Sequence, residues 1–360
     1  MTAPMAHASS PSVAVQAHNS APVRVWLFAV AALVLLMVSL GGATRLTGSG
    51  LSITEWKPLI GMLPPLTEAD WQEAFGKYQQ IPQYEYANKG MSLAAFKVIF
   101  WWEWAHRNLG RLIGIAFALP FLVFLARGDI SRRLGLKLAG IFALGGLQGL
   151  VGWYMVRSGL SDRIDVSHYR LALHLGLAVL ILGALLWTAL SLRDGDAASN
   201  EGSAHSRQAA AGILTLVFVQ ILLGALVAGL KAGHAYNTWP LMDGRIIPSG
   251  LGAIEPWYLN LFENAMTVQF NHRVAAYALL AAVLWRAAAL ARSRSGRGER
   301  RSAGFLAFAV LMQLGLGIWT LLSQVAPALG VAHQAVAAIV FALAVWHSYE
   351  SWFPRHRSQC

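Results

Sequence analysis

Four histidines in apolar stretches of this sequence have the clearest potential for chemistry. They are His106, His174, His272 and His333. An imidazole is costly in lipid and is usually there for a reason, and its neutral ring is a common metal ligand. Two helices that each present one imidazole at the same depth can bind a heme iron from both faces. We therefore predict two heme sites, one between His106 and His174 and one between His272 and His333.

Simpler explanations of these histidines fit the pattern less well. A lone histidine in a membrane helix often forms only an interhelical hydrogen bond, which does not explain four of them at matched positions. A zinc ion would need three or four converging ligands, and one glutamate, Glu103, lies near these histidines in the sequence. Zinc therefore remains a weaker alternative to heme.

A fifth histidine, His347, follows His333 by 14 residues and lies on the same face of a helix. This spacing could stack a second heme across the membrane. The residues at the corresponding places of two other segments are Arg286 and Thr188, so a matching ligand is missing at that depth. We expect His347 to lie at the membrane interface.

The composition indicates that most of the chain lies in a membrane. Of the 360 residues, 56% are hydrophobic and 12% are charged, whereas soluble domains have about 25% charged residues. Lipid leaves helices as the natural way to satisfy the backbone, and a span takes about 20 residues. The eight predicted spans are Val25–Ala43, Trp101–Ala126, Leu134–Val156, Leu171–Leu192, Ala209–Leu230, Asn264–Ala287, Ala303–Val325 and Gly330–Ser351.

The distribution of lysine and arginine predicts the orientation of these spans. The short inner segments carry more basic residues than the longer outer loops, so both termini should be cytoplasmic. The net charge of +11 is then explained by contact with anionic lipid and not with nucleic acid. The expected parts are a disordered cytoplasmic tail (1–24), two four-helix halves (25–192 and 209–351), a cytoplasmic linker (193–208) and a cytoplasmic tail (352–360).

The two halves are similar to each other in sequence. The interval of 47 residues between His106 and Trp153 recurs between His272 and Trp319. An even number of helices in each repeat makes the halves parallel, with a pseudo-two-fold axis along the membrane normal. The predicted fold is thus an all-α membrane protein built from two four-helix repeats. Its large outer loops, Thr44–Phe100 and Lys231–Glu263, could be lids or ordinary aromatic anchors.

Glu103 is the candidate catalytic residue of the N-terminal half. It lies three residues before His106, on the same helix face, and Gln269 occupies the corresponding position of the other half. This difference indicates that chemistry takes place in the N-terminal half. The alternative is a structural ion pair between Glu103 and Arg107, four residues later.

Basic residues near the histidines are candidates for binding heme propionates. Arg107 and Arg273 directly follow two of the histidines, although either could simply reach the interface. Weaker candidates of the same kind are Arg45, Lys97 and Arg111. The sole cysteine, Cys360, rules out a disulfide within the chain and thiolate metal clusters.

Several motifs together resemble those of the heme A synthase family. The segments that carry the resemblance are Glu103–Arg111, Gly42–Ser52, Trp56–Pro58, Gly61–Pro65, Asn271–Arg273 and the helix of His333. The long first outer loop, with Tyr78–Tyr86 and Phe96-Lys97, resembles the branch shared by mitochondria and alphaproteobacteria. Some bacterial members have cysteine pairs in outer loops, and a redox role for such a pair does not carry over to this chain.

The resemblance implies an enzyme of the bacterial inner membrane that oxidises the C8 methyl of heme O to the formyl of heme A, for cytochrome c oxidase. It implies that His272 and His333 ligate a resident heme b, and that His106 and His174 hold the heme O substrate, with Glu103 as the catalytic carboxylate. Expected partners are an unidentified electron donor, with heme O synthase and oxidase assembly factors as further candidates. Two monooxygenations through a gem-diol and electron removal followed by water attack both remain open.

Two other classes of protein fit part of the pattern. A di-heme b-type electron carrier, linked to quinone, would have two equivalent heme sites and no need for Glu103. A transporter with parallel repeats would explain the fold but not the matched histidines. An optical spectrum with identification of the extracted hemes would separate these classes.

Overall fold

The computed structural model is all-helical over the residues it describes, which are 20–57, 60–161, 163–194 and 202–354. Eight of its helices are long and apolar enough to span a membrane, so the predicted all-α membrane fold is confirmed. These helices are α2 (Ser20–Leu46), α5 (Leu93–Ala126), α6 (Arg132–Ser161), α7 (His168–Asp194), α8 (Ala204–Gly229), α10 (Ala265–Arg292), α11 (Arg297–Leu322) and α12 (Pro327–Trp352).

The helices extend beyond the apolar segments that predict them, and α5 does so most. It begins at Leu93 instead of Trp101, and the side chain of Ser92 caps it by accepting from the backbone N–H of Ala95. His106 therefore lies in the fourth turn of its helix, although it is only the sixth residue of the span predicted at Trp101–Ala126. The other three candidate ligands do lie within two turns of the helix start.

The ends of the predicted parts are only partly covered by the structure. α2 begins at Ser20, so the end of the tail expected at 1–24 is helical. Residues 1–19 of that tail, 195–201 of the predicted linker and 355–360 of the C-terminal tail lie outside the described residues.

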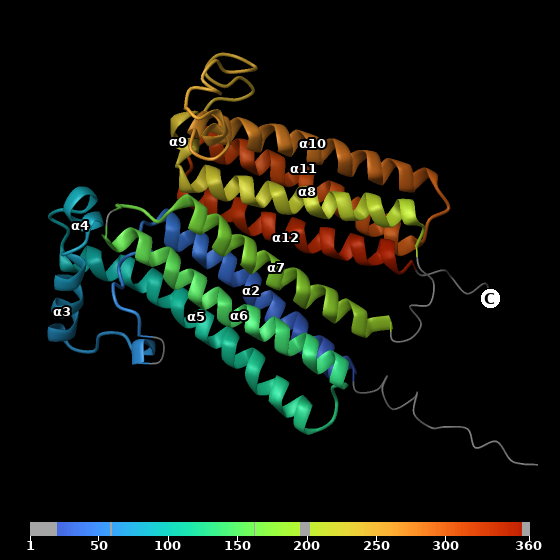
Figure 1. Cartoon of the computed structure of the whole chain (residues 1–360), viewed down its shortest axis with the longest axis horizontal. Coiled ribbons are helices and arrows are strands. Elements are labelled where there is room, and N and C mark those ends of the chain that lie inside the picture. The colour runs from blue at the N-terminus through green and yellow to red at the C-terminus, as the bar shows by residue number, and fades with distance from the viewer. Residues whose placement is uncertain (1–19, 58–59, 162, 195–201, 355–360) are drawn as a thin grey trace, which may run out of the picture.

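The eight helices pack as two groups of four, as Figure 1 shows. In each group the first helix contacts the second and the fourth, and the third helix contacts the fourth. Between the groups, α2 packs on α12, α8 packs on α7, and α7 packs on α12. Exchanging α2 with α8 and α7 with α12 reproduces these contacts, as the predicted pseudo-two-fold axis requires. The repeat itself stays a prediction that this pattern supports.

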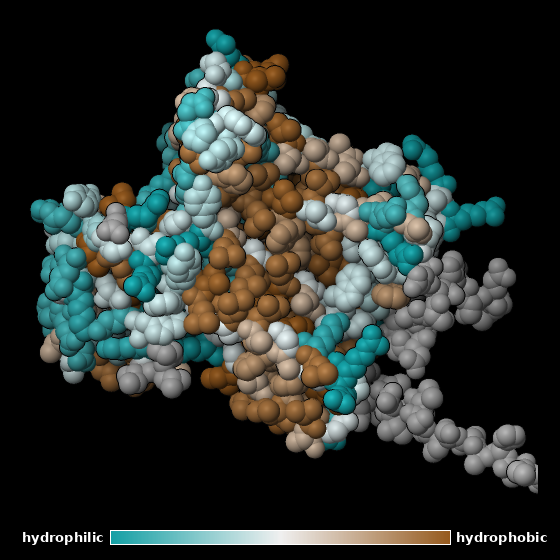
Figure 2. Space-filling model, viewed as in Figure 1, coloured by the Kyte–Doolittle hydropathy of each residue, from teal (hydrophilic) through white to brown (hydrophobic). Residues whose placement is uncertain are grey.

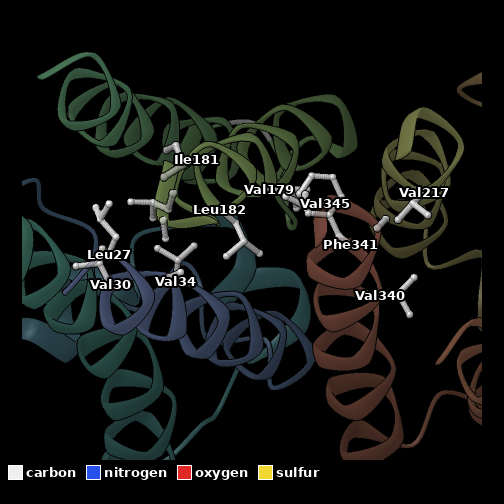
Figure 3. Packing of buried hydrophobic residues seen from close by; sticks show 14 of the residues in the cluster. Leu27, Val30, Val34, Val179, Ile181, Leu182, Val217, Val340, Phe341 and Val345 are labelled. Carbon is white, nitrogen blue, oxygen red and sulfur yellow. The ribbon is translucent and has the colours of Figure 1, made fainter. Parts of the chain in front are cut away.

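One hydrophobic core joins the two groups along α2, α7, α8 and α12. Figure 3 shows Leu27 of α2, Leu182 of α7 and Phe341 of α12 among the side chains that fill it. The ring of Phe341 lies so close to Gly183 that a β-carbon there would be 3.2 Å from it. The inner helices are correspondingly more buried. In the most apolar segment of α7, 44% of the residues are buried, whereas in the corresponding segment of α5 only 6% are. α5 is thus a peripheral helix of its group.

The surface of the molecule carries the apolar band that a bilayer requires. Figure 2 shows hydrophobic side chains across the middle of the long helices and hydrophilic ones at both ends. The band covers the membrane-spanning segments, and less than half of each segment is buried inside the protein. The protein is therefore a multi-pass membrane protein.

The first outer loop folds into an aromatic layer on the beginning of α5. It contains α3 (Glu68–Tyr78) and α4 (Pro82–Ala87), and Thr67 and Asp70 form a capping box at the start of α3. Trp71 is buried against Phe100 of α5, with ring centroids 4.9 Å apart. Trp71 therefore belongs to a packed core and not to an aromatic belt. This layer and α9 (Ala232–Ala235) lie at the same end of the molecule (Figure 1).

A buried polar cluster connects α10, α11 and α12 at the end of the molecule away from the outer aromatic layer. Arg286 donates to Glu299 at 2.6 Å and to Nε2 of His347 at 3.3 Å, and Nδ1 of His347 is 3.0 Å from the hydroxyl of Ser302. The side chain of His347 is fully buried instead of facing the interface as expected. Both ring nitrogens have protein partners, so His347 has no free position for a metal.

Loss of the Arg286 side chain should destabilise the C-terminal group of helices. Removing one partner of a buried ion pair costs about 3–5 kcal/mol, because the other charge stays buried. Arg286→Leu should therefore lower the thermal unfolding temperature of the purified protein in detergent. Arg292→Leu, at an exposed position of the same helix, is the control. An equal effect of both substitutions would contradict a specific role for the cluster.

Candidate heme sites

The structure brings the four histidines together in the two pairs that the sequence predicts. His106 of α5 is close enough to His174 of α7 to interact with it electrostatically, and His272 of α10 is likewise close to His333 of α12. All four side chains are partly exposed. Each pair thus combines one inner helix, α7 or α12, with one peripheral helix, α5 or α10.

Each of these imidazoles packs against a glycine of a neighbouring helix. A β-carbon on that glycine would crowd Cε1 of the ring, so only glycine leaves the ring in its place. The distances from such a β-carbon to Cε1 are 3.0 Å for Gly41 and His106, 2.9 Å for Gly152 and His174, 3.2 Å for Gly224 and His272, and 2.8 Å for Gly317 and His333.

Three glutamines bridge the helices at these contacts. In each case the amide Nε2 donates to the backbone carbonyl of the histidine. The bonds are Gln148 to His174 (3.0 Å), Gln220 to His272 (3.0 Å) and Gln313 to His333 (2.9 Å). The repeat matches Gln148 with Gln313, but the sequence did not indicate that these glutamines contact the histidines. The signal for them is a glutamine four residues before a glycine, which places both on one helix face.

The donor set of each pair suits a heme better than a zinc ion. Two imidazoles from opposite helices are the usual axial ligands of a low-spin heme. Zinc would need further ligands, and the described part of the chain has no group of three or more His, Cys, Asp or Glu side chains that could hold a metal. The residues therefore fit heme at both sites.

Arg273 provides a second feature that fits heme in the C-terminal half. Its Nη2 donates to Gln269 at 3.1 Å and to the carbonyl of Tyr236 at 3.1 Å. Its Nε and Nη1 are buried and have no hydrogen-bond partner among the described residues. A buried guanidinium with free donors beside His272 suits a carboxylate such as a heme propionate.

Glu103 is buried and accepts hydrogen bonds at both carboxylate oxygens. Oε1 accepts from Nε and Nη2 of Arg107, at 3.0 and 2.6 Å. Oε2 accepts from the hydroxyl of Ser52 at 2.8 Å and from the backbone N–H of Ile53 at 2.7 Å. The ion pair considered as a structural alternative is therefore present. It also fixes the carboxylate one turn from His106.

Arg107 is more fully engaged than Arg273. Besides Glu103, it donates to the carbonyls of Ile53 and Glu55, at 2.7 and 3.0 Å. The same segment is fixed by ion pairs of Glu55 with Lys57 and Lys77, whose hydrogen bonds lower the pKa of the Glu55 carboxyl. These pairs stabilise the segment above the pKa of Glu55 in the unfolded chain and lose this effect as the pH falls through the lowered pKa.

The three weaker propionate candidates have protein partners in the structure. Arg45 donates to the carbonyl of Ala228 on α8. Lys97 forms an ion pair with Glu68 at 3.2 Å and lies over the ring of Trp71. The third candidate, Arg111, donates to the carbonyl of Lys57 at 3.0 Å. The outer layer thus engages Lys97, which makes it the weakest of the three.

Substituting Gly317 should release heme from the C-terminal site. In Gly317→Ala the new methyl would lie 2.8 Å from Cε1 of His333 and would turn the ring away from the iron. We expect a loss of bound heme per protein, measured by pyridine hemochrome after purification. Gly315→Ala is the matched control, because a β-carbon there meets no atom within 4 Å. Equal heme content in the two variants would show that the ring tolerates the methyl.

Comparison with known proteins places this fold and these sites in one family. Residues 24–345 match the COX15-CtaA family of cytochrome oxidase assembly proteins. The chain is 56% identical to the heme A synthase of Parvibaculum lavamentivorans over 322 residues, which cover 89% of this chain and 92% of that protein. It is 56% identical to the heme A synthase of Bradyrhizobium diazoefficiens over 325 residues, 90% of this chain and 89% of the relative. The protein belongs to the COX15-CtaA family.

Proposed function

We propose that this protein is a heme A synthase, which oxidises the C8 methyl group of heme O to the formyl group of heme A for cytochrome c oxidase. Family membership and relatives of that name at 51–56% identity support this activity. The observation that carries it is the asymmetry of the two histidine pairs. Both pairs suit heme, but among the described residues only the N-terminal pair has a buried carboxylate, Glu103, one helical turn away.

The two sites would divide the work between a substrate and a resident cofactor. In this proposal His106 and His174 hold heme O, and His272 and His333 hold heme b. The free donors of Arg273 would bind a propionate of the resident heme. A heme b held by His272 and His333 would supply electron transfer.

Glu103 would act at the methyl group of the bound substrate. A fixed carboxylate beside the heme edge can accept a proton from the methyl carbon or stabilise positive charge that develops there. The hydrogen bonds from Arg107, Ser52 and Ile53 hold its oxygens in place. In the other half, Gln269 uses its amide to donate to the carbonyls of Ala232 and Tyr236, and so serves as a structural bridge.

The activity is tested by producing the protein in a bacterial host that makes heme O but not heme A. The hemes are extracted and separated by chromatography. The proposed function requires new heme A together with a fall in heme O. A protein that carries heme b and leaves heme O unchanged would instead be the electron carrier considered above.

We further propose that the protein lies in the bacterial inner membrane with both termini in the cytoplasm. The excess of basic residues on the short inner segments supports this orientation. Electrons would come from a donor still to be identified, and heme O synthase and oxidase assembly factors are candidate partners.

The orientation can be tested with the single natural cysteine. A membrane-impermeant maleimide should label Cys360 only after the cells are permeabilised. In a Cys360→Ser background, Asp243→Cys in the second outer loop, where Asp243 is exposed, should react in intact cells. The reverse pattern would place both termini outside the cell and contradict the predicted orientation.

A further inference from the structure

Each candidate heme ligand lies in a seat that has the same construction. We call the glycine that contacts the imidazole, together with the residue four positions before it, an imidazole seat. The first member is a glutamine in three seats and a methionine in the fourth. The seats are Gln148 with Gly152, Gln220 with Gly224, Gln313 with Gly317, and Met37 with Gly41.

In two of the seats the glutamine contacts Nδ1 of the ring as well as the backbone of its histidine, whereas Gln313 reaches only Nε2 of His333, at 3.5 Å. Besides donating to the histidine carbonyl, Nε2 of Gln148 is 3.2 Å from Nδ1 of His174, and Nε2 of Gln220 is 3.1 Å from Nδ1 of His272. Rotation of the ring would break this contact. The glutamine and the glycine together therefore restrict the imidazole to one orientation.

Each glutamine also retains an unused acceptor. The Oε1 atoms of Gln148, Gln220 and Gln313 are buried and have no hydrogen-bond partner within the described ranges. An imidazole that ligates iron through one nitrogen keeps a proton on the other, and this proton needs an acceptor. A turn of the amide that exchanges Nε2 and Oε1 would present this free oxygen to the ring nitrogen as that acceptor, in place of the bond to the histidine carbonyl.

The seat of His106 lacks this group. Met37 occupies the position of the glutamine, and its terminal methyl packs toward Gly110 of α5, where a β-carbon would be 3.3 Å away. Nδ1 of His106 is buried and has no partner in the part of the chain that the structure describes; the same is true of Nδ1 of His333, but there Gln313 still holds the backbone of the histidine. A thioether neither holds the backbone of His106 nor accepts its ring proton. His106 is therefore the least restrained of the four ligands.

We propose that His106 is the exchangeable ligand of the substrate site, and that its imidazole leaves the iron while His174 stays bound. This inference rests on the proposed function, which assigns heme O to the pair of His106 and His174. Partners of metal ligands typically change metal affinity about 10–100-fold. The absence of an amide at Met37 thus weakens the bond between His106 and the iron of the substrate heme. Both ligands of the resident site have a glutamine partner, so that site keeps both of its bonds.

Carbon monoxide tests this difference, because it binds ferrous heme only where an axial position opens. The full-length protein is loaded with heme O and reduced, and the rate of CO binding is measured by flash photolysis. Wild type should bind CO at the N-terminal site. Met37→Gln, which installs the missing amide, should slow this binding about tenfold, at the lower end of the effect of such partners. Gln220→Met should make the C-terminal site bind CO.

Two further measurements separate the possible failures. Heme O and heme b are quantified in the same samples, and Met37→Leu removes the thioether without adding an amide. Wild type that takes up no heme O would overturn the assignment of the site, and this proposal with it. Full loading with equal CO rates in wild type and Met37→Gln would overturn the proposal alone. Equal slowing by Met37→Leu and Met37→Gln would also overturn it.

Discussion

Replacing His272 or His333 with leucine should remove the low-spin heme b spectrum of the purified protein. Leucine cannot ligate iron, and the remaining imidazole would hold the heme on one face only. Changes in the partners of a ligand already alter metal affinity about 10–100-fold, so loss of the ligand itself should cost more. The measurement is the reduced-minus-oxidised spectrum with pyridine hemochrome quantification of heme b.

The matched variants in the other half should behave differently. His106→Leu and His174→Leu should keep heme b at the level of wild type and bind less heme O, with the larger loss in His174→Leu. This contrast separates a specific loss of ligand from general misfolding, because all four substitutions are chemically the same. Retention of heme b in both His272→Leu and His333→Leu would refute the assignment of the resident heme.

The variant Glu103→Gln should retain heme b and heme O but form little heme A. Acid–base catalysis by a positioned side chain contributes about 10²–10⁴-fold, so heme A formation should fall by about 100-fold or more. The amide keeps the size of the side chain but loses the charge. Arg107, Ser52 and Ile53 all donate to Glu103. The NH₂ group of the glutamine would therefore face a donor and could not accept its hydrogen bond.

Arg107→Gln separates the catalytic role of Glu103 from its structural role. This substitution breaks the same ion pair but leaves the carboxylate in place, still accepting from Ser52 and Ile53. If Glu103 acts on the substrate, Arg107→Gln should make substantially more heme A than Glu103→Gln. Equal loss in the two variants, with equal retention of heme O, would reduce Glu103 to a structural residue. Heme O and heme A are measured by chromatography in cells that carry each variant.

The spans of the fold could be predicted from the sequence, but the exact helix ends could not. An apolar run of spanning length has one stable backbone arrangement in lipid, which is why all eight spans are present. The first turns of α5, Leu93–Phe100, pack against the outer aromatic layer instead of lipid, and their largely apolar sequence does not reveal where the membrane begins. The start at Leu93 follows from the cap at Ser92.

At the candidate sites, the residue types could be predicted, but their partners could not. The repeat spacing identifies the histidines, whereas the contact of His174 with Gly152 depends on how two helices are rotated against each other. The burial of His347 depends on Arg286 and Ser302, which come from two other helices. Contacts between helices far apart in sequence leave little trace in a single sequence.

The contact between α7 and α12 links the two candidate heme sites mechanically. Figure 1 shows α5 and α10 on opposite outer sides of the molecule, while α7 and α12, which carry His174 and His333, share the core at Gly183 and Phe341. A displacement of the packed pair α7 and α12 would move one candidate ligand of each site, whereas movement of α5 would move a ligand of one site only. We therefore expect the position of one inner ligand to respond to the other site, and any resulting change in affinity to be equal in both directions.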